Sequence, residues 1–152
     1  MRVSENPLLP PIDEDNAPFW EAARQCELKV QRCVDTERLI FPPRSHSPWG
    51  EHQIPEWVLV SGRGTLWSYV VPHPPLLPYF AEQAPYNVIV VALEEDPSVR
   101  LVGNLVTIDA RTDLRAVDPA QIVIGTRVRV VFDPGDAEIR LPRWIRDDEA
   151  IS

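Results

Sequence analysis

The amino-acid sequence predicts a mainly β protein that ends in a small barrel. Proline accounts for 17 of the 152 residues, about twice its usual ~5% share, and proline is excluded from helix interiors and central strands. Five or six short apolar segments fall within residues 56–146, separated by turn residues and by one longer connection. That strand number suits a closed barrel, of which the OB fold is the commonest small type, whereas a β-sandwich usually needs about seven strands.

Residues 1–26 are expected to form an arm followed by a docking helix. The segment 1–15 contains three prolines and ends in an acidic cluster, so we predict an extended arm that is either disordered or lies across a partner, and we favour the second. Asn16 is a favourable N-cap, and a proline follows in the first turn of the helix. Phe19 begins an apolar helical face to which Trp20 adds. Because a helix of about ten residues is unstable alone, this face must dock on the body or on a partner.

Residues 27–55 predict a small hairpin domain. Glu27–Arg32 alternates between apolar and polar side chains, and Arg38–Phe41 is a second short apolar run. We expect these two segments to pair as strands around the turn between them. The segment 42–55 is proline-rich and irregular, and it closes the domain.

Residues 56–146 are assigned to the barrel and residues 147–152 to an acidic tail. Short apolar segments bounded by glycine, proline or acidic turns predict the strands. The strands are expected at residues 57–60, 65–71, 87–93, 99–108, 127–132 and 138–144. The third is so uniformly apolar that we expect it to have no free face. Residues 109–126 are expected to hold short helical or turn structure.

The composition excludes several classes of protein. A formal net charge of −8 argues against binding to the phosphate backbone of nucleic acids, which requires a basic surface. Two cysteines do not make a disulfide framework, and Met1–Asn16 shows no secretory apolar segment. The longest clearly apolar run, Val88–Leu93, is far shorter than the ~20 residues of a membrane span. We therefore expect a cytoplasmic protein that does not enter a membrane.

No set of residues indicates catalysis. The sequence has neither a G-x-S-x-G elbow nor a cysteine-protease signature, and Gly62-Arg63-Gly64 lacks the third glycine of a dinucleotide fingerprint. Cys26, Cys33, His46 and His52 have two spacings that fit a zinc site, but the first interval is too long. We predict no catalytic residues and no metal ligands in this chain.

Four arginines could gather on one outer face of the barrel. Alternation places Arg127 and Arg129 on the same side of their strand, and Arg140 and Arg143 follow on the next one. Such a patch could contact nucleic acid, the phosphates of an acyl-CoA or an acidic partner, and the negative net charge ranks nucleic acid last. His73 lies at a strand end beside a long loop, where histidine is more often structural than functional.

Five segments then occur in an order that is typical of a known family. They are FWEAARQCELKVQRC (19–33), RLIFPPR (38–44), WVLVSGRGTLWSYVVPHPP (57–75), PYNVIVVALEEDPSVRLVGNLV (85–106) and IGTRVRVVFD (124–133). Over about residues 16–145 the chain thereby resembles the acyl-CoA-associated zinc-ribbon/OB-fold family, long catalogued as a domain of unknown function. The resemblance implies an N-terminal helix, a rubredoxin-like ribbon with four zinc-binding cysteines, and an OB barrel.

The ribbon of this chain is degenerate by comparison with that family pattern. Cys33 holds the first cysteine position, but Thr36 stands at the second, and Ser47 and Gly50 stand at the third and fourth. A single thiolate cannot hold a structural zinc ion, which takes four ligands. We therefore expect no zinc, and we expect Trp49, neighbouring apolar side chains and a partner surface to replace it.

The resemblance implies a non-catalytic auxiliary subunit of a thiolase-like acyl-CoA enzyme, such as an aldolase or ketothiolase of steroid or aromatic degradation. The partner would be a thiolase-like or lipid-transfer-protein-like aldolase subunit in a hetero-oligomer, and this chain would order its active-site entrance and help to seat CoA. Phe19, Trp20 and Trp49 are the expected partner contacts. Arg127 and Arg129 are the expected neighbours of the CoA phosphates, with no cofactor bound by this chain itself.

Other interpretations stay open. One is a subunit of a hotdog-fold enoyl-CoA hydratase, and another is a nucleic-acid-binding OB module in which Trp67, Tyr69 and Tyr79 would stack bases. A stand-alone small enzyme is the third, although no residue set favours it. The sequence does not identify the acyl chain, the partner or the stoichiometry, nor whether Cys33 or His73 has a role.

Overall fold

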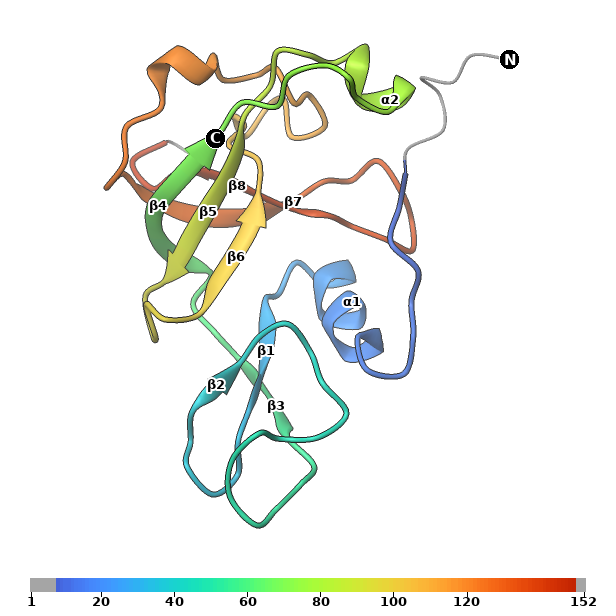
Figure 1. Cartoon of the computed structure of the whole chain (residues 1–152), viewed down its shortest axis with the longest axis vertical. Coiled ribbons are helices and arrows are strands. Elements are labelled where there is room, and N and C mark those ends of the chain that lie inside the picture. Colours follow the sequence, from blue (N-terminus) through green and yellow to red (C-terminus); the bar gives the residue numbers. More distant parts are fainter. Residues whose placement is uncertain (1–7, 150–152) are drawn as a thin grey trace.

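The computed structural model describes residues 8–149 as two antiparallel sheets, shown in Figure 1. The smaller sheet has the order β2-β1-β3 and contains β1 (Lys29–Arg32), β2 (Leu39–Ile40) and β3 (Glu56–Leu59). The larger has the order β6-β5-β4-β7-β8 and contains β4 (Arg63–Val70), β5 (Val88–Leu93), β6 (Arg100–Gly103), β7 (Arg127–Phe132) and β8 (Pro142–Arg146). The helices are α1 (Ala17–Arg24), α2 (Pro78–Ala81) and the 3-10 helix η2 (Pro119–Gln121). The predicted class, mainly β with a ribbon before a barrel, is confirmed.

Helix α1 begins where the sequence predicts but caps itself differently. The side chain of Asn16 makes no capping bond to the helix; its Oδ1 accepts from the N–H of Asp13, whose own carboxylate accepts from the N–H of Asn16, both at 2.8 Å. Phe19 and Trp20 lie edge to face and are 6% and 7% exposed. In Figure 1 the helix lies beside β1, between the two sheets. The aromatic face therefore docks on the body of the chain.

Strand β3 extends the ribbon, although we expected the barrel to start at Glu56. Its backbone pairs with β1, Lys29 opposite Leu59, and the N–H of Val60 continues the pairing to the carbonyl of Leu28. Gly62 then turns the chain into the barrel with a φ of +76°, a conformation that glycine adopts without steric cost. The sequence pattern shows an apolar strand here but does not show which sheet it joins.

Strand β4 occupies the centre of the barrel, with β5 on one side and β7 on the other. A Cβ on Gly64 would overlap the carbonyl oxygen of Ala92 on β5, so a glycine allows these strands to approach. A register shift between Leu66 and Ser68 bends β4 further.

The barrel closes earlier than the predicted strand lengths suggest. β6 ends at Gly103 rather than near Ile108, because the indole of Trp144 lies against it: a Cβ on Gly103 would be 2.9 Å from that ring. Beyond this point Leu105 forms a parallel bridge with Trp144, which joins the two edge strands. Trp144, with no exposed surface, is thus the residue around which the barrel closes.

One hydrophobic core runs through the ribbon, α1 and the barrel. It contains buried residues of α1 and β1 together with buried residues of every barrel strand. Its members include Phe19, Trp20, Leu28, Val30, Leu66, Ile89, Leu101, Val128 and Trp144. A smaller cluster of Val106, Val131 and Ile145 lies on the other face of β7 and β8. None of the helices within residues 8–149 combines the length and apolar character that crossing a bilayer requires.

Candidate functional site

The positions that the family resemblance assigns to zinc ligands do come together in the ribbon. Cys33 is fully buried, and hydrogen bonds from the side chains of Ser47 and then Thr36 lower the pKa of its thiol to about 7. The thiol donates to the carbonyl oxygen of Trp49, with Sγ and O 3.4 Å apart. The hydroxyl of Ser47 accepts from the N–H of Trp49 at 3.2 Å. Cys33 and Ser47 are therefore joined through the backbone of Trp49.

The fourth position, Gly50, is adjacent to the carboxylate of Asp35. Oδ2 of Asp35 accepts from the N–H groups of Glu51 at 2.6 Å and His52 at 2.8 Å, and Oδ1 hydrogen-bonds Nδ1 of the His52 ring. These bonds, the backbone N–H of His52 first among them, hold the pKa of Asp35 below its usual value. A Cβ on Gly50 would overlap Oδ2 of Asp35. Asp35 thus joins the turn after β1 to the loop before β3.

Arg127 and Arg129 lie on the same side of β7, as alternation predicts, but in different environments. The exposed guanidinium of Arg127 pairs with Glu94, Nη2 to Oε1 at 2.9 Å. The side chain of Arg129 is only 18% exposed and donates to the backbone carbonyls of Asp147 and Glu149. Arg127 is therefore a surface arginine paired with one carboxylate, whereas Arg129 holds the C-terminal segment against the barrel.

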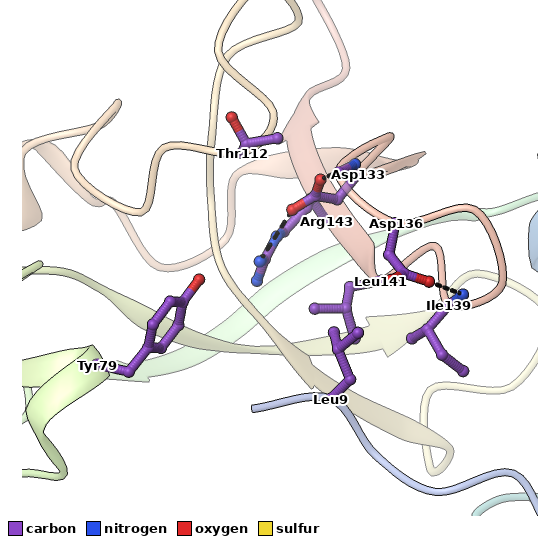
Figure 2. Close-up of a pocket in the computed structure, with 9 residues that line it drawn as sticks. Leu9, Tyr79, Thr112, Asp133, Asp136, Ile139, Leu141 and Arg143 are labelled. Carbon is purple, nitrogen blue, oxygen red and sulfur yellow. Dashed lines mark hydrogen bonds and ion pairs between the residues drawn. The ribbon is translucent and has the colours of Figure 1, made fainter. Parts of the chain in front are cut away.

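Arg143 does not join those arginines on an open patch, because the Val131–Ile145 cluster lies between them on that face. Its guanidinium pairs with Asp133, Nη2 to Oδ2 at 3.2 Å, and the two side chains are 11% and 12% exposed. Together they form the base of a pocket of about 110 Å³. Figure 2 shows the guanidinium directed at the carboxylate of Asp133, with Leu9 of the arm beside Leu141. No sequence pattern connects these residues, so this pocket was not predicted.

A buried polar network leads inward from Arg143. The guanidinium donates to Oδ1 of Asn104, whose amide donates to the carbonyl of Asn87. Asn87 has no exposed surface; its Oδ1 accepts from the N–H of Leu105 at 2.7 Å, and its amide donates to the Leu105 carbonyl at 3.0 Å. The network fixes the start of β5 to the segment that closes the barrel.

The expected partner contacts lie in two environments. Phe19 and Trp20 belong to the chain's own core. The small accessible part of each side chain lines one wall of an apolar groove. Trp49 is half-buried, and the guanidinium of Arg38 lies 3.9 Å from its ring centroid. The groove runs from α1 to α2 and is also lined by Phe41, Phe80, Tyr86, Val88, Val102 and Leu141.

The outer face of β4, β5 and β6 is apolar and continues this groove. Trp67, Val70 and Val102 are 49%, 60% and 67% exposed, and Val102 is paired with half-buried Val90 of β5. Arg100 covers Trp67, with its Cζ 3.7 Å from the ring centroid. We predicted no free face for β5, but its outer valines are only partly covered. A uniformly apolar sequence does not distinguish a strand buried on both faces from a strand whose outer face is apolar but partly exposed.

Comparison with known proteins identifies the family. Residues 57–133 match the family model described as ChsH2, C-terminal OB-fold domain, and residues 20–47 match ChsH2, rubredoxin-like zinc ribbon domain. This chain belongs to the ChsH2 family. A chain of the Ltp2-ChsH2(DUF35) aldolase is similar to it with a TM-score of 0.70 and 33% identity, covering 91% of this chain and 98% of that one. A DUF35 protein from Sulfolobus solfataricus, TM-score 0.55 and 12% identical, covering 88% of this chain and 86% of that one, shares the fold.

Two curated relatives are longer proteins. The 3-oxo-4,17-pregnadiene-20-carboxyl-CoA hydratase alpha subunit of Mycobacterium tuberculosis is 35% identical over 138 residues, which is 90% of this chain and 38% of that protein. The probable enoyl-CoA hydratase alpha subunit of Thermomonospora curvata is 36% identical over 133 residues, which is 88% of this chain and 38% of that protein. The chain spans less than half the length of these relatives.

The ribbon of this ChsH2-family chain does not fit a zinc ion. Zinc in structural sites takes four thiolate, imidazole or carboxylate ligands, and Thr36, Ser47 and Gly50 supply none of these. Within the described part of the chain, no group of three or more histidine, cysteine, aspartate or glutamate side chains could hold a metal ion. The alternative set that includes Cys26 and His46 is therefore not assembled: Cys26 is exposed at the end of α1.

The described histidines do not build a catalytic relay. Nδ1 of His46 hydrogen-bonds the hydroxyl of its neighbour Ser45, but the carboxylate of Asp35 is bonded to a different histidine, His52. A nucleophile, a base and a group that orients the base must act together, and these pairs are separate. His73 is exposed in the loop between β4 and α2.

Proposed function

We propose that this chain is a non-catalytic auxiliary subunit of an acyl-CoA aldolase, in which a thiolase-like or lipid-transfer-protein-like partner supplies the catalytic residues. The observation that carries this proposal is the similarity to a chain of the Ltp2-ChsH2(DUF35) aldolase, which extends over 98% of that chain. The name of that enzyme joins two components. The similarity covers ribbon and barrel together, so the unit that is shared is the whole ribbon–barrel body.

The apolar outer face of β4, β5 and β6 is the proposed contact with the partner. Trp67, Val70 and Val102 expose about half or more of their side chains, and contiguous apolar patches on a protein surface mark interaction sites. The groove walled by Phe19 and Trp20 continues this face. Together they present the partner with one apolar strip, to which Trp49 of the ribbon adds a second contact.

Arg127 is the proposed neighbour of the CoA phosphates, because its guanidinium is exposed and exchanges one surface carboxylate for another anion at little cost. Arg129 acts from beneath, by holding residues 147–149 in place. The substrate under this proposal is an acyl-CoA of steroid or aromatic degradation. Both cysteines are free thiols, which supports a reducing, cytoplasmic location.

A second candidate is a subunit of an enoyl-CoA hydratase. The observation that favours it is the identity of 35% and 36% with two proteins named as hydratase alpha subunits. The region matched in each of them is 38% of that protein. The two candidates share an acyl-CoA enzyme and a partner, and they differ in the reaction.

Co-expression with a candidate thiolase-like partner tests the proposal. We expect a stoichiometric hetero-complex that cleaves a 3-hydroxyacyl-CoA by retro-aldol reaction, whereas the partner alone is inactive. Val102→Asp should abolish the complex, and Val123→Asp, at a valine that is 66% exposed outside the proposed face, should not. A partner that is fully active alone, with no complex formed, would overturn the proposal. Hydration of an enoyl-CoA by the complex would favour the second candidate.

A further inference from the structure

The ribbon has to hold a long irregular segment against a short sheet. Residues 42–55 leave β2, run over the end of β1 and return as β3. In the ChsH2 zinc ribbon model that this region matches, a metal would join the two turns. The described residues of this chain offer no such metal site, so other bonds must carry that connection.

Three side chains in alternate positions make the connection. Gln31 lies in β1, Cys33 directly follows that strand, and Asp35 lies in the turn after it. Each forms hydrogen bonds with the backbone of the segment between β2 and β3. We call these three residues the side-chain ladder.

Gln31 is the first rung of the ladder. Its amide donates to the carbonyl of Arg44 at 2.8 Å and accepts from the N–H of Arg44 at 2.7 Å. The side chain of Gln31 is only 3% exposed. A buried amide that satisfies both backbone groups of one residue acts as a strand partner would, and it fixes the point where the irregular segment begins.

Cys33 is the second rung, and its thiol donates to the carbonyl of Trp49. Ser47, which stands at a cysteine position of the family, accepts from the N–H of the same Trp49. A hydroxyl oxygen thus takes the place in the turn where the family has a thiolate. The ring of Trp49 is held from outside by Arg38.

Asp35 is the third rung and makes the largest number of bonds. Its carboxylate accepts from two successive backbone N–H groups and from the ring of His52. Because a Cβ on Gly50 would overlap this carboxylate, a cysteine at position 50 and the third rung exclude each other. The carboxylate of Asp35 therefore occupies the space that a cysteine side chain at position 50 would need.

We propose that the side-chain ladder replaces the structural zinc ion, so that the ribbon folds in the absence of metal. The proposal concerns this chain alone and does not depend on the function proposed above. It differs from our expectation from the sequence, in which Trp49, apolar side chains and a partner surface took over the role of the metal. Here the chain's own hydrogen bonds do so.

Metal content and variants of the full chain test the ladder. We expect purified protein to contain less than about one-tenth of a zinc ion per chain and to keep its melting temperature in EDTA, unlike zinc ribbons, whose folding energy comes from the metal. Asp35→Ala should lower the melting temperature by about 3 °C or more. Asp109→Ala, which removes an exposed aspartate outside the ribbon, should leave it unchanged. One zinc per chain, or equal melting temperatures for the two variants, would overturn the proposal.

A gain of metal binding gives a second measurement that does not require a destabilised variant. Thr36→Cys, Ser47→Cys and Gly50→Cys together restore four cysteines but retain the carboxylate that overlaps position 50. We expect this triple variant to give no cobalt–thiolate absorption of a tetrahedral site, and the same variant with Asp35→Gly to give it. A four-thiolate cobalt spectrum from the triple variant would contradict the exclusion of metal by Asp35.

Discussion

Replacement of Asn87 by alanine measures how strongly the buried network holds the barrel closed. The lost amide would leave the N–H and C=O of Leu105, which is 1% exposed, without their partners at 2.7 and 3.0 Å. Each buried polar group left unsatisfied costs about 1–3 kcal/mol, so two of them cost about 2–6 kcal/mol. A water molecule can enter the space left by the amide and restore part of this. We therefore expect the free energy of unfolding to fall by about 3 kcal/mol.

Urea unfolding followed by tryptophan fluorescence measures this loss by linear extrapolation. Asn16→Ala is the matched control, because the same side chain is removed from the N-terminus of α1, where its partners can bind water instead. The control should lose at most about 1 kcal/mol. A loss for Asn87→Ala no larger than that of Asn16→Ala would refute the reasoning that this amide is a structural bond of the barrel.

Three further outcomes can be measured on the same protein. Gly103→Ala places a methyl group against the buried indole of Trp144 and should cost about 1–3 kcal/mol in urea unfolding; an unchanged midpoint would mean that the ring shifts freely. The pKa of Asp136 is held below its usual value by backbone N–H groups, that of Ile139 first, so its stabilisation is complete above about pH 4 and is lost as the pH falls through that lowered pKa. The difference in melting temperature between wild type and Asp136→Ala should accordingly shrink at about pH 3, and a constant difference would contradict this. Arg127→Ala should change stability by less than about 0.5 kcal/mol but raise the KM for acyl-CoA in the complex, and an unchanged KM would remove Arg127 from the CoA site.

Local sequence patterns predicted the elements of the fold well. The alternation in Arg127–Phe132 located β7 to the residue, and proline and glycine located the loops around it. Local patterns failed where contacts between distant residues decide which strands pair and where a strand ends. The pairing of β3 with β1 depends on the path of the chain at Gly62, and the early end of β6 depends on a tryptophan 41 residues away in the sequence. Neither contact leaves a periodic signal.

The candidate site was predictable only in part. Family spacing identified Cys33, Thr36, Ser47 and Gly50 as the former ligand positions, and the structure brings them together. The sequence did not identify Gln31 and Asp35 as the residues proposed to replace the metal. A glutamine in a strand and an aspartate in a turn have no feature in sequence that separates them from ordinary surface residues. Strand alternation does not reach Asp35 either, because β1 ends at Arg32 and Asp35 lies in the turn that follows.

The core that joins α1, β1 and the barrel determines how this protein can be divided. One family model ends at residue 47 and the other begins at residue 57. The buried apolar side chains before and after this interval nevertheless belong to one cluster. A cut there would expose the inner faces of both halves to water, and a ribbon of this size has too little core to fold alone. The chain should accordingly unfold in a single cooperative transition. We therefore expect that the two family models do not correspond to two independently stable domains.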